Sequence, residues 1–116
     1  MYLDLGAFGE QAAASYLEKQ GYHVLERNFS CRVGEIDIIA SLGEIIVFVE
    51  VKTRKNLNYG LPCESVTSSK KEHIKKAVRY YALRNNLFQN DFRLDVIEIY
   101  IKGEKAYIHH MEDAFR

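Results

Sequence analysis

Apolar residues recur along the chain with two periods, and each period predicts one type of secondary structure. Spacings of three and four residues predict helices over 4–20 and 67–87. Alternating or continuous apolar runs rich in β-branched residues predict strands over 22–29, 35–41, 45–54, 92–101 and 105–111. This order describes a sheet with helices packed on it, and strands on both sides of the second helix permit one parallel crossover. We therefore expect an α/β (α+β) fold with a central mixed sheet of about five strands, flanked by helices.

Turn and capping residues divide these elements. Gly21 ends the first predicted helix, and Thr67 is a suitable N-cap for the second. Leu42-Gly43 is short enough for a tight hairpin between two strands. Residues 55–65 contain the only proline and read as a loop, which either closes over a bound ligand or only connects its neighbours. With 116 residues, the chain is expected to be a single domain over 1–116.

Composition narrows the class of protein. Apolar residues make up 47% of the chain, which excludes disorder. Sixteen basic residues balance sixteen acidic ones, so an anionic partner must be met by a local basic patch. Cys31 and Cys63 lie far apart without metal-finger spacing, and we expect them to be reduced. With neither a signal peptide nor a run of the ~20 apolar residues that a membrane requires, we expect a cytoplasmic protein that does not enter the membrane.

Charged side chains interrupt the most apolar part of the sequence. Strand alternation places Glu50 and Lys52 on one face of their strand. If Ser41 pairs with Glu44 across the turn, Asp37 and Glu50 become diagonal neighbours on a shared face. A slip of one residue would put the two carboxylates on opposite faces, so this prediction depends on the register.

Two adjacent carboxylates repel each other unless a cation or a shared proton lies between them. Oxygen ligands favour Mg²⁺, with Mn²⁺ as a substitute, and such an ion can bind a phosphate and acidify a water. Lys52 could position or deprotonate that water, and Glu10 on the first helix is a candidate third carboxylate. A solvated strand face would give the same pattern of charges. The flanking strands are apolar on both faces, however, and unpaired charge is costly in such surroundings, which favours a functional site.

The spacing of Asp37, Glu50 and Lys52, with 12 residues between the acids, resembles the PD-(D/E)xK signature of restriction-endonuclease-like nucleases. The whole chain resembles the bacterial YraN family of that superfamily, and it is similar to archaeal Holliday-junction resolvases. The resemblance implies that Asp37 and Glu50 are metal carboxylates and Lys52 the catalytic lysine, with Glu10 the acid that resolvase-like members carry on a helix. Ile36 stands where the superfamily has proline. The matching residues are Gly6, Gly9, Glu10, Ala12-Ala13, Gly21-Tyr22, Glu26-Arg27-Asn28-Phe29, Gly34-Glu35-Ile36-Asp37, Val47 to Arg54, Lys70 and Asp95-Val96-Ile97.

Basic residues near these acids are candidate phosphate contacts. Lys71, Lys75 and Arg79 recur at i, i+4 and i+8 and would form a stripe along the second helix. Arg54 and Lys70 flank the 55–65 loop, and Lys70 is the strongest candidate for a phosphate clamp. A stripe of this kind suits the phosphate backbone of DNA, but a solvated helix face would look the same.

Other residues that suggest chemistry carry less weight. His109 and His110 are neighbours on a strand and point to opposite faces, so they cannot readily bind one ion. Tyr81 lies on the apolar face of its helix and belongs to the core, and Asp95 supports the sheet or the site without binding metal.

These features predict a Mg²⁺-dependent nuclease that hydrolyses phosphodiester bonds in DNA, including structured or junction DNA. The alternative is a catalytically silent nucleic-acid-binding or adaptor protein that keeps the fold. Because many nucleases cut two strands as twofold dimers, a homodimer is a further expectation.

Overall fold

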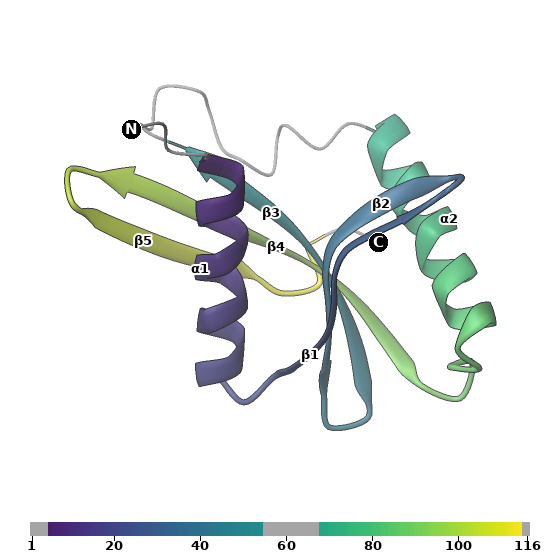
Figure 1. The fold of residues 1–116 in the computed structure, drawn as a ribbon. Coiled ribbons are helices and arrows are strands. Elements are labelled where there is room, and N and C mark those ends of the chain that lie inside the picture. Colours follow the sequence, from purple (N-terminus) through teal and green to yellow (C-terminus); the bar gives the residue numbers. More distant parts are fainter. Residues whose placement is uncertain (1–4, 55–67, 115–116) are drawn as a thin grey trace.

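A computed structural model describes residues 5–54 and 68–114 and contains the predicted elements in the predicted order (Figure 1). The helices and strands are α1 (Leu5–Lys19), β1 (His23–Cys31), β2 (Gly34–Leu42), β3 (Ile45–Arg54), α2 (Ser68–Arg84), β4 (Asp91–Lys102) and β5 (Lys105–Met111). Two predicted features, the Thr67 cap and the 55–65 loop, lie outside the described residues, as does Cys63. Neither described helix combines the length and the apolar character that a membrane crossing needs.

The strands form one mixed five-stranded sheet in the order β1-β2-β3-β4-β5. The β1–β2, β2–β3 and β4–β5 pairs are antiparallel, whereas β3 and β4 are parallel. A parallel pair needs a crossover connection, and α2 lies within it. The predicted mixed sheet with one parallel crossover is therefore confirmed.

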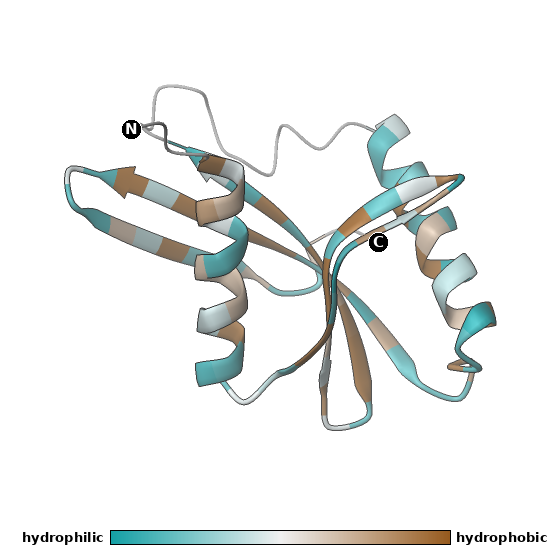
Figure 2. Ribbon diagram, viewed as in Figure 1, coloured by the Kyte–Doolittle hydropathy of each residue, from teal (hydrophilic) through white to brown (hydrophobic). Residues whose placement is uncertain are grey.

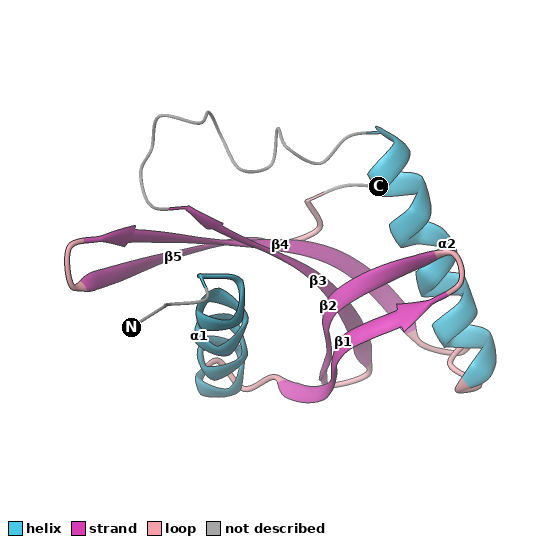
Figure 3. Cartoon of the chain, turned by 45° about the horizontal axis from the view of Figure 1, so that its top comes forward, coloured by secondary structure: helices cyan, strands magenta, loops and turns pink. Residues whose placement is uncertain are grey.

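The two helices cover opposite faces of the sheet and enclose separate parts of the core (Figure 3). Alternation along β3 divides its side chains, with Phe48 packed on the α2 side and Val47 and Val49 on the α1 side. The predicted apolar face of α2 is buried, including Tyr81. Figure 2 shows hydrophobic segments along the strands in the middle of the molecule and hydrophilic segments on both helices. A strand covered on both faces explains why β3 reads as a nearly continuous apolar run.

The β2–β3 hairpin differs from the predicted register by two residues. Leu42 pairs with Ile45, so the two-residue turn is Gly43-Glu44. Gly43 has a φ of +62°, a conformation that such turns often require and that glycine adopts without strain. The predicted pairing of Ser41 with Glu44 is therefore wrong. Because the difference is an even number of residues, every side chain keeps its predicted face.

The β2–β3 ladder ends just before Asp37. Towards Gly34, the ladder ends at the pair of Ile38 and Val49. Past this pair, the Val51 N–H donates a hydrogen bond to the side chain of Asp37, at 2.8 Å from Oδ2. Beyond this point β1 and β2 turn towards α2, while β3, β4 and β5 continue on the other side (Figure 1). Asp37 therefore lies where the sheet divides, with its carboxylate at the dividing point.

Two glycines let the helices approach these strands closely. A Cβ added at Gly9 of α1 would lie 1.7 Å from the Thr53 hydroxyl on β3. A Cβ added at Gly34 of β2 would lie 2.7 Å from the backbone oxygen of His73 on α2. The absence of a side chain at each position sets the distance from helix to sheet on both sides of the divided strands.

Candidate active site

A cavity of about 410 Å³ opens where β2 and β3 separate. Asp37 and Glu50 line it, together with Glu10 from α1 and Lys52 from the same strand as Glu50. The same two carboxylates also line a second cavity of about 250 Å³ on the side of α2. The four residues predicted to be catalytic thus meet around one cavity, and Asp37 and Glu50 separate it from its neighbour. The remaining lining residues of the larger cavity are Leu5, Gly6, Val51, Thr53 and Arg54.

Asp37 is held in surroundings that disfavour its charge. Burial and the nearby Glu50 carboxylate raise the pKa of Asp37 from 3.8 to about 7, and Glu10 adds to this effect. The hydrogen bond from the Val51 N–H and the charge of Lys70 act in the opposite direction. Burial is the larger cause of the raised pKa and the second carboxylate adds to it, as expected of a partly buried pair arranged to share a cation.

Glu50 is balanced by two lysines from different elements. Its side chain is only 8% exposed, and Oε1 lies 3.3 Å from Lys52 Nζ and 2.5 Å from Lys70 Nζ. Lys70, the strongest candidate for a phosphate clamp, is thus paired with a carboxylate, and its phosphate-binding role stays a prediction. No local pattern links a residue at the start of α2 to one on β3, so this contact could not be predicted from spacing.

The two lysines differ electrostatically. Burial lowers the pKa of Lys52, and the neighbouring Lys70 lowers it further, whereas Glu50 opposes the shift. Burial acts on Lys70 in the same direction, but its contacts with Glu50 and Lys52 outweigh this effect and raise the pKa of Lys70. Lys52 is consequently the better proton acceptor and Lys70 the more persistent cation.

Arg54 provides a donor at the rim of the larger cavity. Within residues 5–54 and 68–114, its Nε is the buried side-chain nitrogen or oxygen that has no hydrogen-bond partner. A buried donor without an acceptor is costly, and an anion entering the cavity would satisfy it. This observation agrees with the predicted phosphate-binding role of Arg54.

The predicted basic stripe follows α2 away from Lys70. Lys71 and Lys75 are half-buried at the margin of the packed face, and Arg79 is exposed. Lys75 lies 3.9 Å from the exposed Glu72, and an ion pair this long at the surface stabilises the helix little. The structure leaves both interpretations of the stripe open, a phosphate-binding surface or a solvated face.

The donors around the cavity fit a hard divalent cation with few protein ligands. Among the described residues, no group of three His, Cys, Asp or Glu side chains is placed to enclose an ion. Mg²⁺ commonly takes one or two carboxylates and completes its coordination with water and phosphate oxygens. Asp37 and Glu50 match that requirement, and Glu10 lines the same cavity, where its carboxylate could hold an ordered water.

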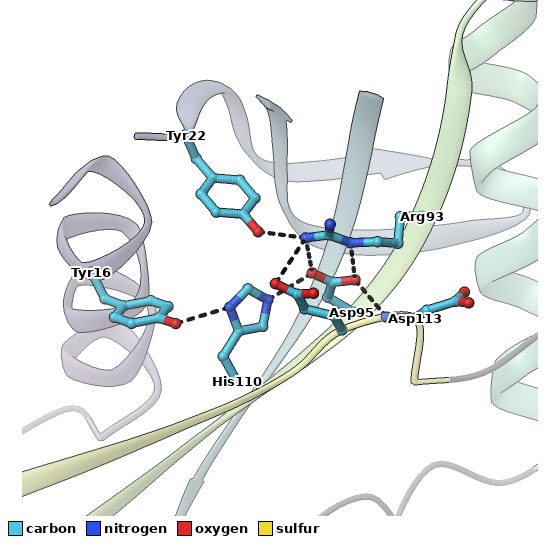
Figure 4. Close-up of polar contacts among 7 residues, drawn as sticks. Tyr16, Tyr22, Arg93, Asp95, His110 and Asp113 are labelled. Atoms are coloured by element: carbon cyan, nitrogen blue, oxygen red, sulfur yellow. Dashed lines mark hydrogen bonds and ion pairs between the residues drawn. The ribbon is translucent and has the colours of Figure 1, made fainter. Parts of the chain in front are cut away.

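Asp95 has a different role, at the centre of a buried network on the α1 side (Figure 4). Arg93 donates to both of its carboxylate oxygens at 2.9 Å, and the Asp113 N–H donates to Oδ1 at 2.9 Å. His110 Nε2 lies 2.6 Å from Oδ2, and its other ring nitrogen contacts the Tyr16 hydroxyl at 3.0 Å. Burial alone would raise the pKa of Asp95, but these hydrogen bonds together hold it below its usual range. Asp95 therefore ties α1, β4 and β5 together, as expected of a residue that supports the sheet.

The side chains of His109 and His110 lie on opposite faces of the sheet, as predicted for neighbours on a strand. His110 belongs to the Asp95 network, whereas His109 is largely exposed and lies 3.5 Å from the buried Glu98 carboxylate. Glu98 also accepts a hydrogen bond from the Tyr100 hydroxyl at 2.5 Å. The exposed His23 and His73 contribute no side chain to these clusters.

Comparison with known sequences identifies the family. The profile of the family described as uncharacterised protein family UPF0102 matches residues 9–99. The chain belongs to the UPF0102 family. A UPF0102 protein of Alkaliphilus metalliredigens is 46% identical over 115 residues, covering 99% of this chain and 100% of that protein. One of Clostridium kluyveri is 50% identical over 115 residues, covering 97% and 94%. The predicted membership of the YraN family, which is the UPF0102 family, is therefore confirmed.

Comparison with solved structures identifies the fold of this UPF0102 protein. The structure of Hjc from Archaeoglobus fulgidus, a Holliday junction resolvase from an archaeal hyperthermophile, superposes with a TM-score of 0.52 at 17% identity. The match covers 92% of this chain and 76% of that one. The predicted restriction-endonuclease-like fold is confirmed, and at this level of identity the likeness concerns the fold alone.

Proposed function

We propose that this UPF0102 protein is a Mg²⁺-dependent nuclease that hydrolyses phosphodiester bonds in DNA, including structured or junction DNA. The observation that supports this most directly is the convergence of Asp37, Glu50 and Lys52 on one cavity at the point where the sheet divides. The fold is shared with a protein named as a Holliday junction resolvase, which is the reason for including junction DNA among the substrates.

Each side chain has a definable part in such a hydrolysis. Bound to Asp37 and Glu50, Mg²⁺ would polarise a phosphate oxygen and acidify a water. Lys52, whose pKa is lowered, is placed one pleat from Glu50 to orient that water or accept its proton. Arg54, whose Nε–H has no acceptor among the described residues, can hold a neighbouring phosphate, and Glu10 on α1 can orient water in the same cavity.

The proposal is tested by incubating the protein with duplex, flap, single-stranded and four-way-junction DNA in Mg²⁺ or Mn²⁺. Cleavage of at least one form is expected. Glu50→Ala and Lys52→Ala should each abolish it, and the double variant should be little worse, because residues that act as one catalytic unit are strongly non-additive. Glu50→Gln keeps the shape of the buried side chain and should be equally inactive.

Glu44→Ala is the matched control, since Glu44 is an exposed carboxylate on the β2–β3 turn and lines neither cavity. Its activity should equal that of the wild type. If the wild type binds DNA and cleaves none of the four forms with either metal, the nuclease proposal is overturned in favour of a silent nucleic-acid-binding protein.

A further inference from the structure

The Glu50 carboxylate is engaged from two directions by cations that belong to the protein itself. Lys70 Nζ lies 2.5 Å from Glu50 Oε1, closer than Lys52 Nζ at 3.3 Å to the same oxygen. A metal ion that took Glu50 as a ligand would have to share or displace these ammonium groups. Lys70 therefore affects how readily a metal ion can bind to Glu50.

The position of Lys70 is fixed by the packing of its helix. Lys70 lies one turn before His73, whose backbone carbonyl is pressed against Gly34 on β2. The next residue, Ile74, is buried in the core, and Lys70, His73 and Ile74 line the smaller cavity with Asp37 and Glu50. Although the Lys70 side chain is 40% exposed, the packing of His73 and Ile74 holds this turn of α2 against the sheet.

We propose that Lys70 couples metal binding to nucleic-acid binding by holding Glu50 until a phosphate group enters the site, an inference that rests on the proposed function. Without DNA, the ammonium group of Lys70 neutralises Glu50 and competes with a divalent cation for it. When a phosphate enters, Lys70 moves from Glu50 to the phosphate oxygens, and Glu50 becomes available as a metal ligand.

The electrostatic reason is the balance of charge in a partly enclosed site. A divalent cation beside Lys52 and Lys70 meets two positive charges, and these repel it more strongly than they would in water. One DNA phosphate supplies a negative charge that both the ion and Lys70 can share. Each ligand should therefore raise the affinity of the other, and thermodynamic linkage requires the two factors to be equal.

The test measures Mn²⁺ affinity by electron paramagnetic resonance of the free ion, so it does not depend on activity. Binding is measured alone and with a phosphorothioate duplex oligonucleotide, which keeps the negative charge of DNA and resists hydrolysis. Lys70→Met should bind Mn²⁺ alone about tenfold more tightly than the wild type, within the ~5–150-fold range of typical coupling. The duplex should then raise the Mn²⁺ affinity of this variant less than it raises that of the wild type.

Two further variants isolate the role of position and charge. Lys76→Met removes the same charge from an exposed site on α2 and should behave as the wild type in both measurements. Lys70→Arg keeps a cation near Glu50 and should retain the coupling. Melting in EDTA verifies that each variant is folded.

The possible results separate this inference from the proposed function. If the wild type binds Mn²⁺ and Lys70→Met binds it equally or more weakly in the absence of DNA, the coupling role of Lys70 is overturned and the metal site stands. If neither protein binds Mn²⁺ with or without the duplex, the metal site itself is absent, and both proposals fall.

Discussion

Glu50 is a carboxylate that the fold has almost removed from water. A buried charge is costly unless it is paired, and Glu50 is paired with Lys52 and Lys70. Asp37 has no lysine ion pair among those found in the described residues, and its raised pKa shows that its charged form is disfavoured there. At the scale of single residues, the two carboxylates thus differ: the charge of Glu50 is neutralised by lysines, and the charge of Asp37 is disfavoured by its surroundings.

This inequality predicts a pH dependence of stability. The folded protein holds the Asp37 proton more tightly than the unfolded chain does, since the pKa rises from 3.8 to about 7 on folding. In EDTA, the free energy of unfolding should therefore fall as the pH rises from about 4 to about 7, by an amount on the order of 2–4 kcal/mol. Asp37→Asn should remove most of that slope while its amide oxygen still accepts the Val51 N–H. Urea unfolding across this pH range measures the effect.

The same variant should also lose the stabilisation that metal confers. Binding to the folded state alone adds RT ln(1 + [L]/Kd), or about 1.4 kcal/mol at ten times Kd, and each kcal/mol shifts the melting temperature by roughly 4–8 °C in a domain of this size. Glu44→Gln, at an exposed carboxylate on the turn, should keep both the slope and the metal gain. If wild type and Asp37→Asn melt alike with and without millimolar Mn²⁺, Asp37 is not a metal ligand.

At the scale of elements, the site depends on how closely two helices approach the divided strands. Gly9 and Gly34 provide the space, one for α1 on β3 and the other for α2 on β2. The Asp95 network adds a polar connection, because Tyr16 of α1 reaches His110 of β5. Glu10 and Lys70 are brought to the cavity region by helices that these contacts hold in place.

Gly34→Ala should disturb the α2 side specifically. The new Cβ would lie 2.7 Å from the His73 backbone oxygen and 3.2 Å from its carbonyl carbon, so the helix backbone must shift. Overpacking of this kind costs about 1–3 kcal/mol, which thermal or urea unfolding detects. Because Lys70 moves with α2, its ion pair with Glu50 should weaken as well.

A small change on the adjacent strand serves as the control for this variant. Ser30→Ala alters an exposed residue of β1 and should change stability by less than about 0.5 kcal/mol. If Gly34→Ala is as stable as Ser30→Ala, α2 is free to move away from β2, and the close approach does not position Lys70.

At the scale of the whole molecule, sixteen basic and sixteen acidic residues leave no net charge to attract DNA from a distance. Affinity for a polyanion must then come from local clusters, and Lys71, Lys75 and Arg79 form one that begins beside Lys70. Changing all three to Gln should weaken DNA binding and reduce the slope of log affinity against log salt by about 0.9 for each phosphate that is no longer neutralised. Fluorescence anisotropy over a salt series measures both.

The control removes three charges elsewhere. Lys76, Lys102 and Lys105 are exposed and lie outside the stripe, and their replacement by Gln should leave the slope nearly unchanged. An equal effect of the two triple variants would mean that only total charge matters and that the stripe is a solvated face.

The sequence by itself determined the elements of this protein and the identity of its chemical groups. The strands β3 and β5 have the predicted bounds, and the other described elements differ from prediction by a few residues at their ends. Periodicity is a local property, so a window of residues is enough to reveal it. The face on which Glu50 and Lys52 lie was also predictable, because alternation depends only on the strand being extended.

The tertiary structure alone decided how these groups meet. The turn at Gly43-Glu44 shifted the register by two residues, and the end of the ladder at Ile38 gave Asp37 the Val51 N–H as a partner. The ion pair between Lys70 and Glu50 joins residues twenty positions apart through the packing of α2 against Gly34. Such pairings depend on how distant segments fill one volume, and no local window of sequence carries that information.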